Sequence, residues 1–164
     1  MLYQFNPKYD HLLNEVFIND PFFADNSKLY KEYLSEVTAE WLGSQTVWTT
    51  FITFTFKDEV TQESAIRALR RFIRLANEIQ YGNNYTRKVS HSYFQYACGL
   101  ERQERGVIHF HMCIDRPINY QWVHTYWGMH HGFAWIEKIT DQHKSLSYCL
   151  KYAVKDGDLF IYLK

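Results

Sequence analysis

Two histidines in the stretch VIHFHMCI, residues 107–114, are the first residues of this chain that suggest chemistry. The stretch alternates in the manner of a half-buried β-strand, with apolar side chains at every second position. His109 and His111 then point to the same side, about 6–7 Å apart, which is close enough to share one metal ion. A His-x-His pair is also common on ordinary strands, so a metal site requires a third ligand.

A carboxylate on a neighbouring strand could be that ligand. The stretch SYFQYACGLE, residues 92–101, alternates as well, and only RQERG separates it from 107–114, so the two strands must be antiparallel. This pairing brings Glu101 near His109 on the same face; Glu104, in the turn, is the second choice. Two imidazoles and a carboxylate suit Mg²⁺, Mn²⁺ or another divalent ion acting as a Lewis acid.

Other metal-binding side chains fit this site less well. Cys113 shares the face of the two histidines, but we expect it to be a small buried residue. His130 and His131 are adjacent in WGMHHGFAW, so they would point apart on a strand. We expect single hydrogen bonds or surface positions for them.

A tyrosine-lysine stripe follows near the C-terminus, in SLSYCLKYAVK, residues 145–155. The stripe has helical spacing and comprises Tyr148, Lys151, Tyr152 and Lys155. A tyrosine that attacks a phosphodiester must lose its proton, which it ordinarily holds with a pKa of about 10. Nearby ammonium groups favour the phenolate and balance charge in the transition state. The alternative is an amphipathic helix with aromatic edges and solvated lysines.

The elements that must position these residues form an α+β pattern. Strands are predicted at 46–56, 92–101, 107–114, 132–139 and 159–163, and helices at 61–80, 119–127 and 142–155. We expect one antiparallel sheet with helices on one face and a polar face left open. In FITFTF, Thr53 and Thr55 should lie on that open face and orient ligands or DNA. Residues 1–45 are interpreted as a helical N-terminal extension, broken at NDPFFADNS (19–27), and 46–164 as the main domain.

Composition and charge describe a folded domain without a membrane segment. The 164 residues are 46% hydrophobic, with a net charge of zero, and no apolar run approaches the roughly 20 residues that span a bilayer. The start lacks the pattern of a signal peptide, and three widely spaced cysteines predict neither a disulfide framework nor a Cys-based zinc site. We therefore expect a cytoplasmic protein.

A row of arginines on the predicted helix 61–80 is a candidate DNA-binding surface. It comprises Arg67, Arg70, Arg71 and Arg74, at the spacing of one helix face. A solvated face opposite the apolar stripe explains the row equally well. Aromatic residues in 119–135 could stack unpaired bases, although core packing explains at least half of them.

Taken together, the motifs resemble those of HUH-type single-strand endonucleases, specifically the rolling-circle replication initiators (Rep proteins). FITFTF at 51–56 looks like the first motif, HFHM at 109–112 like the His-hydrophobe-His motif, and YCLKYAVK at 148–155 like the two-tyrosine motif Y-x-x-x-Y-x-x-K. They occur in the order of the family and span residues 46–155. The resemblance implies a ferredoxin-like HUH fold for this part of the chain.

The resemblance also implies a reaction and its residues. A divalent ion, Mg²⁺ or Mn²⁺, would be held by His109 and His111 with Glu101, and a tyrosine would attack single-stranded DNA to leave a 5′-phosphotyrosine and a free 3′-OH. Tyr148 or Tyr152 would be the nucleophile, with Lys151 or Lys155 assisting. The substrate would be an origin, with a hairpin as one form, and a host helicase or polymerase would be a further partner.

Two other readings remain open at this stage. One is a single-tyrosine HUH transposase, although such proteins typically carry a Gln four residues after the tyrosine, where this chain has Tyr152. The other is a non-catalytic ferredoxin-like module that binds nucleic acid, which would need aromatic pairs on the open sheet face. No phosphate-binding G-x-x-x-x-G-K-[ST] motif of a helicase occurs in the sequence.

Overall fold

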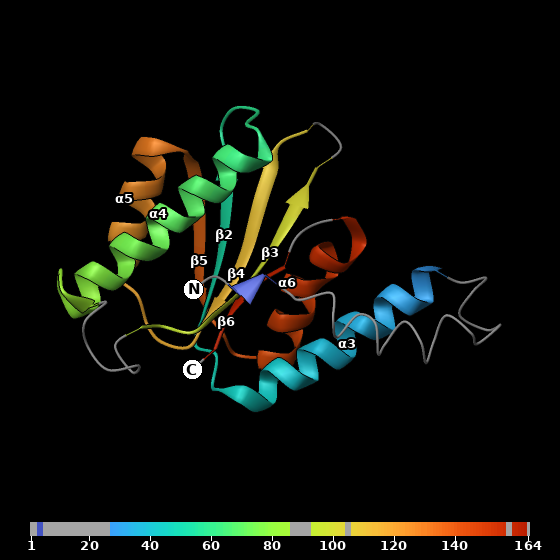
Figure 1. Ribbon diagram of the computed structural model, residues 1–164. Coiled ribbons are helices and arrows are strands. Elements are labelled where there is room, and N and C mark those ends of the chain that lie inside the picture. Colours follow the sequence, from blue (N-terminus) through green and yellow to red (C-terminus); the bar gives the residue numbers. More distant parts are fainter. Residues whose placement is uncertain (1–2, 5–26, 86–92, 104–105, 157–158, 164) are drawn as a thin grey trace.

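The computed structural model describes residues 3–4, 27–85, 93–103, 106–156 and 159–163, with the backbone alone at 3–4, 27–31 and 152–156. Its centre is a six-stranded antiparallel sheet with the strand order β1-β6-β3-β4-β2-β5 (Figure 1). The strands are β1 (Tyr3–Gln4), β2 (Thr50–Phe56), β3 (Tyr96–Arg102), β4 (Ile108–Ile114), β5 (Gly132–Lys138) and β6 (Leu159–Tyr162).

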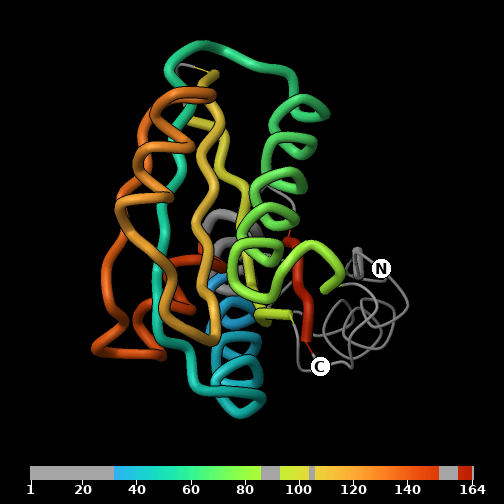
Figure 2. The backbone as a smooth tube through the Cα atoms, turned by 90° about the vertical axis from the view of Figure 1, so that its left-hand side faces the viewer, coloured from blue at the N-terminus to red at the C-terminus, as the bar shows by residue number. Residues whose placement is uncertain are grey.

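Four described helices cover the two faces of this sheet. They are α3 (Ser27–Gln45), α4 (Gln62–Tyr81), α5 (Tyr120–His130) and α6 (Gln142–Asp156). Helices α4 and α5 lie on one face, and Figure 2 turns them toward the viewer. On the other face α6 packs against β3 and β4, and α3 packs on α6 (Figure 1).

The larger core lies between the sheet and helices α4 and α5. Apolar side chains at alternate positions of the strands, such as Phe54 and Phe110, meet the apolar stripe of α4 and the inner side of α5. Phe54 contacts Phe72 and Trp127, with ring centroids 4.7 and 4.3 Å apart. Alternation at every second residue therefore commits one face of each strand to this core and turns the intervening side chains to the other face.

Helix α4 begins and ends as its sequence predicts. The Thr61 hydroxyl accepts a hydrogen bond from the backbone N–H of Ser64, which caps the first turn. At the other end Gly82 adopts a positive φ of 85° and donates its backbone N–H to Glu78. These two signals explain why the predicted range of 61–80 differs from the observed helix by only one residue at each end.

The α+β class and the antiparallel sheet are confirmed, whereas the expectation of helices on one face alone is wrong. A second core forms on the other face, where Phe51, Ala97 and Cys113 are covered by Leu146 and Leu150 of α6. These three strand residues are apolar members of an otherwise polar face, so they need a cover that excludes water. Helix α6 therefore covers part of the face that we expected to be open.

The N-terminal part is helical in its described residues. Helix α3 contributes Ala39 and Leu42 to the second core, and β1 adds a strand beside β6 that the sequence did not predict. Most of the predicted break at 19–27 lies outside the described residues. The division of the chain at residue 45 stays a prediction. Among the described residues, no helix is both long enough and apolar enough to cross a membrane.

Strand β5 depends on a close approach at its first residue, Gly132. A Cβ atom at this position would lie 2.3 Å from the carbonyl oxygen of Thr55 and 2.5 Å from the backbone nitrogen of Lys57. Gly132→Ala should therefore lower the free energy of unfolding by about 1–3 kcal/mol, as overpacking typically does. Urea unfolding followed by circular dichroism would measure it.

The matched control for Gly132→Ala is Gly128→Ala in the middle of α5. A Cβ at Gly128 meets nothing within 4 Å. Alanine is a better helix former than glycine, so this variant should be stabilised by up to about 1 kcal/mol. If Gly132→Ala unfolds at the same urea concentration as the native chain, β5 does not approach β2 in this way.

Candidate metal centre and nucleophile

Glu101, His109 and His111 converge on the polar face of the sheet. Each offers one ligand atom, and these atoms all lie within 4.8 Å of one another. Glu101 is directly opposite His109 in the pairing of β3 with β4, and His111 follows His109 by two residues on the same side. The antiparallel hairpin thus brings the three predicted ligands together, and they fit a divalent ion that prefers imidazole and carboxylate.

Threonines on β2 hold the far side of both imidazole rings. Thr53 is paired with His111 and Thr55 with His109. The Thr53 hydroxyl lies 3.2 Å from Nδ1 of His111, and the Thr55 hydroxyl lies 3.5 Å from Nδ1 of His109. Because Nδ1 of each ring faces a threonine, Nε2 is left to face the centre, and at His111 it lies 3.0 Å from the Glu101 carboxylate. Such partners fix the orientation of metal-binding histidines.

The environment of His111 keeps its ring neutral. Its side chain is almost fully buried, and this burial lowers the pKa of His111 from its ordinary value of 6.5, although the hydrogen bond to Glu101 opposes the shift. A neutral imidazole is the form that binds a metal ion. The site therefore presents His111 in its ligating state at neutral pH.

The other candidate ligands lie elsewhere. Cys113 belongs to the second core, and burial raises the pKa of its thiol well above the ordinary value, so it remains protonated. His131 contacts Trp127, with centroids 4.6 Å apart, on the side of α5. Its neighbour His130 is exposed, and Glu104 lies outside the described residues.

Tyr148 on helix α6 lies directly against the metal-binding group. Its ring meets that of His111 edge to face, with centroids 5.1 Å apart and planes at 86°. It also touches Phe51, at 5.9 Å, yet 45% of its surface stays exposed. A phenol that is both beside a metal ligand and open to solvent can reach a large substrate.

The next residue along the helix fixes this arrangement. The Cys149 thiol donates a hydrogen bond to the backbone carbonyl of His111, with 2.8 Å between sulfur and oxygen. On the same side of α6, Leu146 and Leu150 are fully buried. The helix is therefore anchored on both sides of Tyr148, against the strand that carries the histidines.

The structure places the remaining members of the tyrosine-lysine stripe only in part. Lys151 is exposed on the same helix, one turn after Tyr148. The backbone of α6 includes Tyr152 and Lys155, while their side chains lie outside the described residues. A role for these two residues stays a prediction.

The predicted arginine row does not come near the metal-binding group. Helix α4 packs through its apolar stripe on the face opposite the histidines. Arg67 lies 3.8 Å from Glu63 and Arg74 lies 3.7 Å from Glu78, as on a solvated helix face. Contact of Arg67, Arg70, Arg71 and Arg74 with DNA stays a prediction, and such contact would lie on another side of the molecule.

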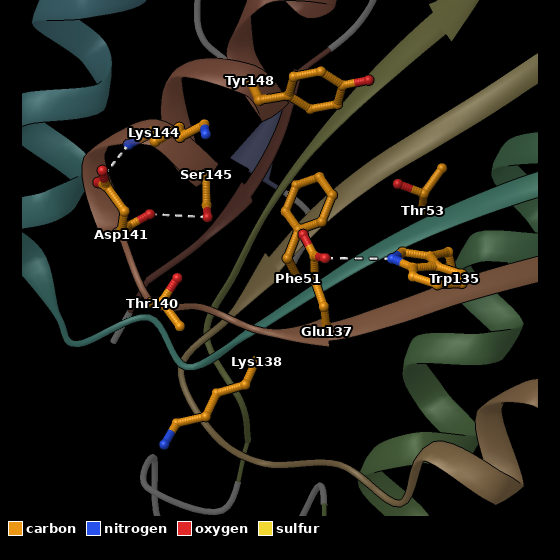
Figure 3. A pocket seen from close by; sticks show the side chains of 10 residues that line it. All are labelled: Phe51, Thr53, Trp135, Glu137, Lys138, Thr140, Asp141, Lys144, Ser145 and Tyr148. Carbon is orange, nitrogen blue, oxygen red and sulfur yellow. Dashed lines mark hydrogen bonds between the residues drawn. The ribbon is translucent and has the colours of Figure 1, made fainter.

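A pocket of about 390 Å³ opens beside Tyr148, between α6 and the edge of the sheet (Figure 3). Its wall includes Phe51 and Thr53 of β2 and Trp135 and Glu137 of β5. The sequence analysis did not single out Trp135, because the rings of 119–135 could not be divided between core and surface. The pairing of β5 with β2 supplies the missing signal, since it sets Trp135 opposite Thr53.

Comparison with known proteins adds a family to this geometry. Residues 49–157 match the family model described as replication-associated protein ORF2. The chain belongs to this family. The matched part includes β2, the metal-binding group, Tyr148 and the pocket, so the family relates all of them to DNA replication.

One solved structure is similar in part. It is the crystal structure of the hypothetical protein ORF119 from Sulfolobus islandicus rod-shaped virus 1, with 20% sequence identity and a TM-score of 0.41. The similarity covers 78% of this chain and 95% of that one. No curated protein matches the chain.

The threonine behind His111 provides a test of the metal centre. Thr53→Val keeps the shape of the side chain but removes the hydroxyl at 3.2 Å from the ring nitrogen. Loss of such a supporting partner typically weakens metal affinity about 10- to 100-fold. Isothermal titration of the full chain with Mn²⁺ should show this loss. Thr140→Val, at a threonine beyond β5, is the control, and equal affinities in both variants would contradict the site.

Proposed function

We propose that this chain cuts and rejoins single-stranded DNA through a covalent bond to Tyr148, and so initiates rolling-circle replication. The observation that carries the proposal is the position of the Tyr148 ring, 5.1 Å from His111 and still open to solvent. A nucleophile and a group able to bind a divalent ion thus face the same space. Membership in a replication-associated family supports this assignment.

The reaction is a transesterification at phosphorus. The Tyr148 phenol loses its proton to solvent, its oxygen bonds to the scissile phosphorus, and the bond from phosphorus to the 3′-oxygen breaks. The released 3′-oxygen takes up a proton, and a 5′-phosphotyrosine remains. One phosphoester replaces another, so a later 3′-OH can attack the phosphotyrosine and restore a continuous strand.

Each side chain around Tyr148 has a defined task in this proposal. His109, His111 and Glu101 would hold a divalent ion, Mg²⁺ or Mn²⁺, which supplies Lewis-acid stabilisation of negative charge on the phosphate. Thr53 and Thr55 keep the two rings in place. Lys151 supplies positive charge near the phenolate, and Tyr152 with Lys155 would be a second nucleophile and its partner.

Single-stranded DNA at a replication origin is the proposed substrate, with a hairpin as one possible form. Because the chain carries no phosphate-binding helicase motif, a host helicase would separate the strands and a host polymerase would extend the 3′-OH.

The proposal is tested by trapping the covalent bond. The protein is mixed with a labelled pool of single-stranded DNA and Mn²⁺ and then run on a denaturing gel. Tyr148→Phe should reduce the protein–DNA adduct by at least about 10³-fold, since the nucleophilic oxygen is lost. Tyr33→Phe removes the hydroxyl of an exposed tyrosine on α3 and serves as the matched control.

The tyrosine at 152 is tested in the same experiment. Loss of the adduct in Tyr148→Phe alone makes Tyr148 the nucleophile, and loss only in the double variant Tyr148→Phe/Tyr152→Phe means that the two tyrosines substitute for one another. An adduct that persists in the double variant, or one that forms equally well in EDTA, would overturn the proposed reaction. DNA binding without any adduct would favour the non-catalytic module.

A further inference from the structure

The polar face of the sheet continues past the threonines onto the edge strand β5. Phe133 is paired with Thr55, and Trp135 with Thr53, so both rings lie in the same cross-strand rows as the histidines. Their side chains are 55% and 57% exposed. Among the large exposed aromatic side chains of the described residues, these two are the ones that the sheet carries.

The indole of Trp135 is held in a fixed orientation. Its Nε1–H donates a hydrogen bond to the Glu137 carboxylate, with 3.3 Å between the two atoms (Figure 3). Phe133 precedes it by two residues on the same side of the strand, about 6–7 Å away. Exposing two large apolar rings to water is unfavourable, and a preoriented ring surface of this kind suits a flat ligand.

The adjoining pocket is suited to one nucleotide. Its volume of about 390 Å³ is in the range of small-molecule sites, and its wall extends from Trp135 to Thr53 and Tyr148. Any ligand in it would therefore lie next to the nucleophile and to the threonine behind His111.

The charges of the pocket favour a base over a phosphate. Lys138 and Lys144 line it together with the carboxylates of Glu137 and Asp141. Asp141 accepts a hydrogen bond from the backbone N–H of Lys144, at 3.0 Å, which fixes its negative charge in the wall. Two positive and two negative groups do not attract a polyanion, whereas an uncharged base can stack on the indole and meet polar groups at its edge.

We propose that Trp135 stacks on an unpaired base in this pocket, beside the nucleotide whose phosphate meets Tyr148, and that Phe133 stacks on a further base. The inference rests on the proposed function for the kind of strand that is bound. It adds the binding mode: the edge strand grips bases and leaves the phosphate chain to the metal-binding group. Base stacking of this kind tolerates sequence variation, because every base has a π-face.

The test compares a strand with bases to one without them. Fluorescence anisotropy in EDTA measures the Kd of the full chain for labelled oligo(dT), and for an abasic strand with the same number of phosphates. The native chain should bind oligo(dT) about tenfold more tightly or better, and Trp135→Ala should lose most of that preference, since one stacked base typically contributes a factor of this size.

Two control variants separate stacking from a damaged fold. Trp135→Phe keeps an aromatic ring and should keep most of the preference. Trp41→Ala removes an indole of similar exposure, 47%, from helix α3, away from the sheet, and should keep it entirely. If Trp135→Ala weakens binding to both strands equally, or if the native chain does not distinguish them, the stacking site is overturned.

Two further outcomes are informative. Because EDTA removes the metal, the binding measurement does not depend on cleavage: a base preference without any adduct overturns the reaction and retains the stacking site, and an adduct without the preference does the reverse. If Trp135→Ala instead converts a dimer into a monomer in light scattering, with the preference unchanged, the rings cover a second copy of the chain and the proposal fails.

Discussion

The register of the central strand β4 is the constraint on which the site depends. Its neighbours β3 and β2 pair with it on both sides, so Glu101 and Thr55 both lie opposite His109. The same alternation commits Phe110 and Met112 to the larger core. A slip of one residue would bury the histidines in the apolar core and expose the phenylalanine, which burial energy strongly opposes. The core thus enforces the geometry of the metal-binding group.

The second core explains how a tyrosine distant in sequence reaches the histidines. Phe51, Ala97 and Cys113 interrupt the polar face with apolar surface, and helix α6 covers them. Covering this patch places Tyr148 at the border between buried and open sheet. The thiol of Cys149, bonded to the carbonyl of His111, sets the height of the helix along the strand. Packing and chemistry are therefore coupled through two consecutive residues of α6.

Much of the site could be read from alternation and spacing. The two histidines, Glu101 and the threonines follow from strand parity and a short hairpin, and the structure brings all of them together. The position of α6 could not be read in this way, because an amphipathic helix does not reveal which face of a sheet it covers. The same limit applied to the arginines of α4, whose helix turned out to lie on the far side. Trp135 needed the pairing of β5 with β2, which no local pattern encodes.

The order of these parts along the chain gives the protein a sequence of maturation. Strands β2, β3 and β4 contain the whole metal-binding group and its threonines by residue 114, whereas Tyr148 follows on a helix that begins at Gln142. A chain still on the ribosome could thus form the metal-binding group before its nucleophile has left the exit tunnel. On the proposed function, a nascent or truncated chain would be unable to break DNA, and docking of α6 would be the event that arms the enzyme.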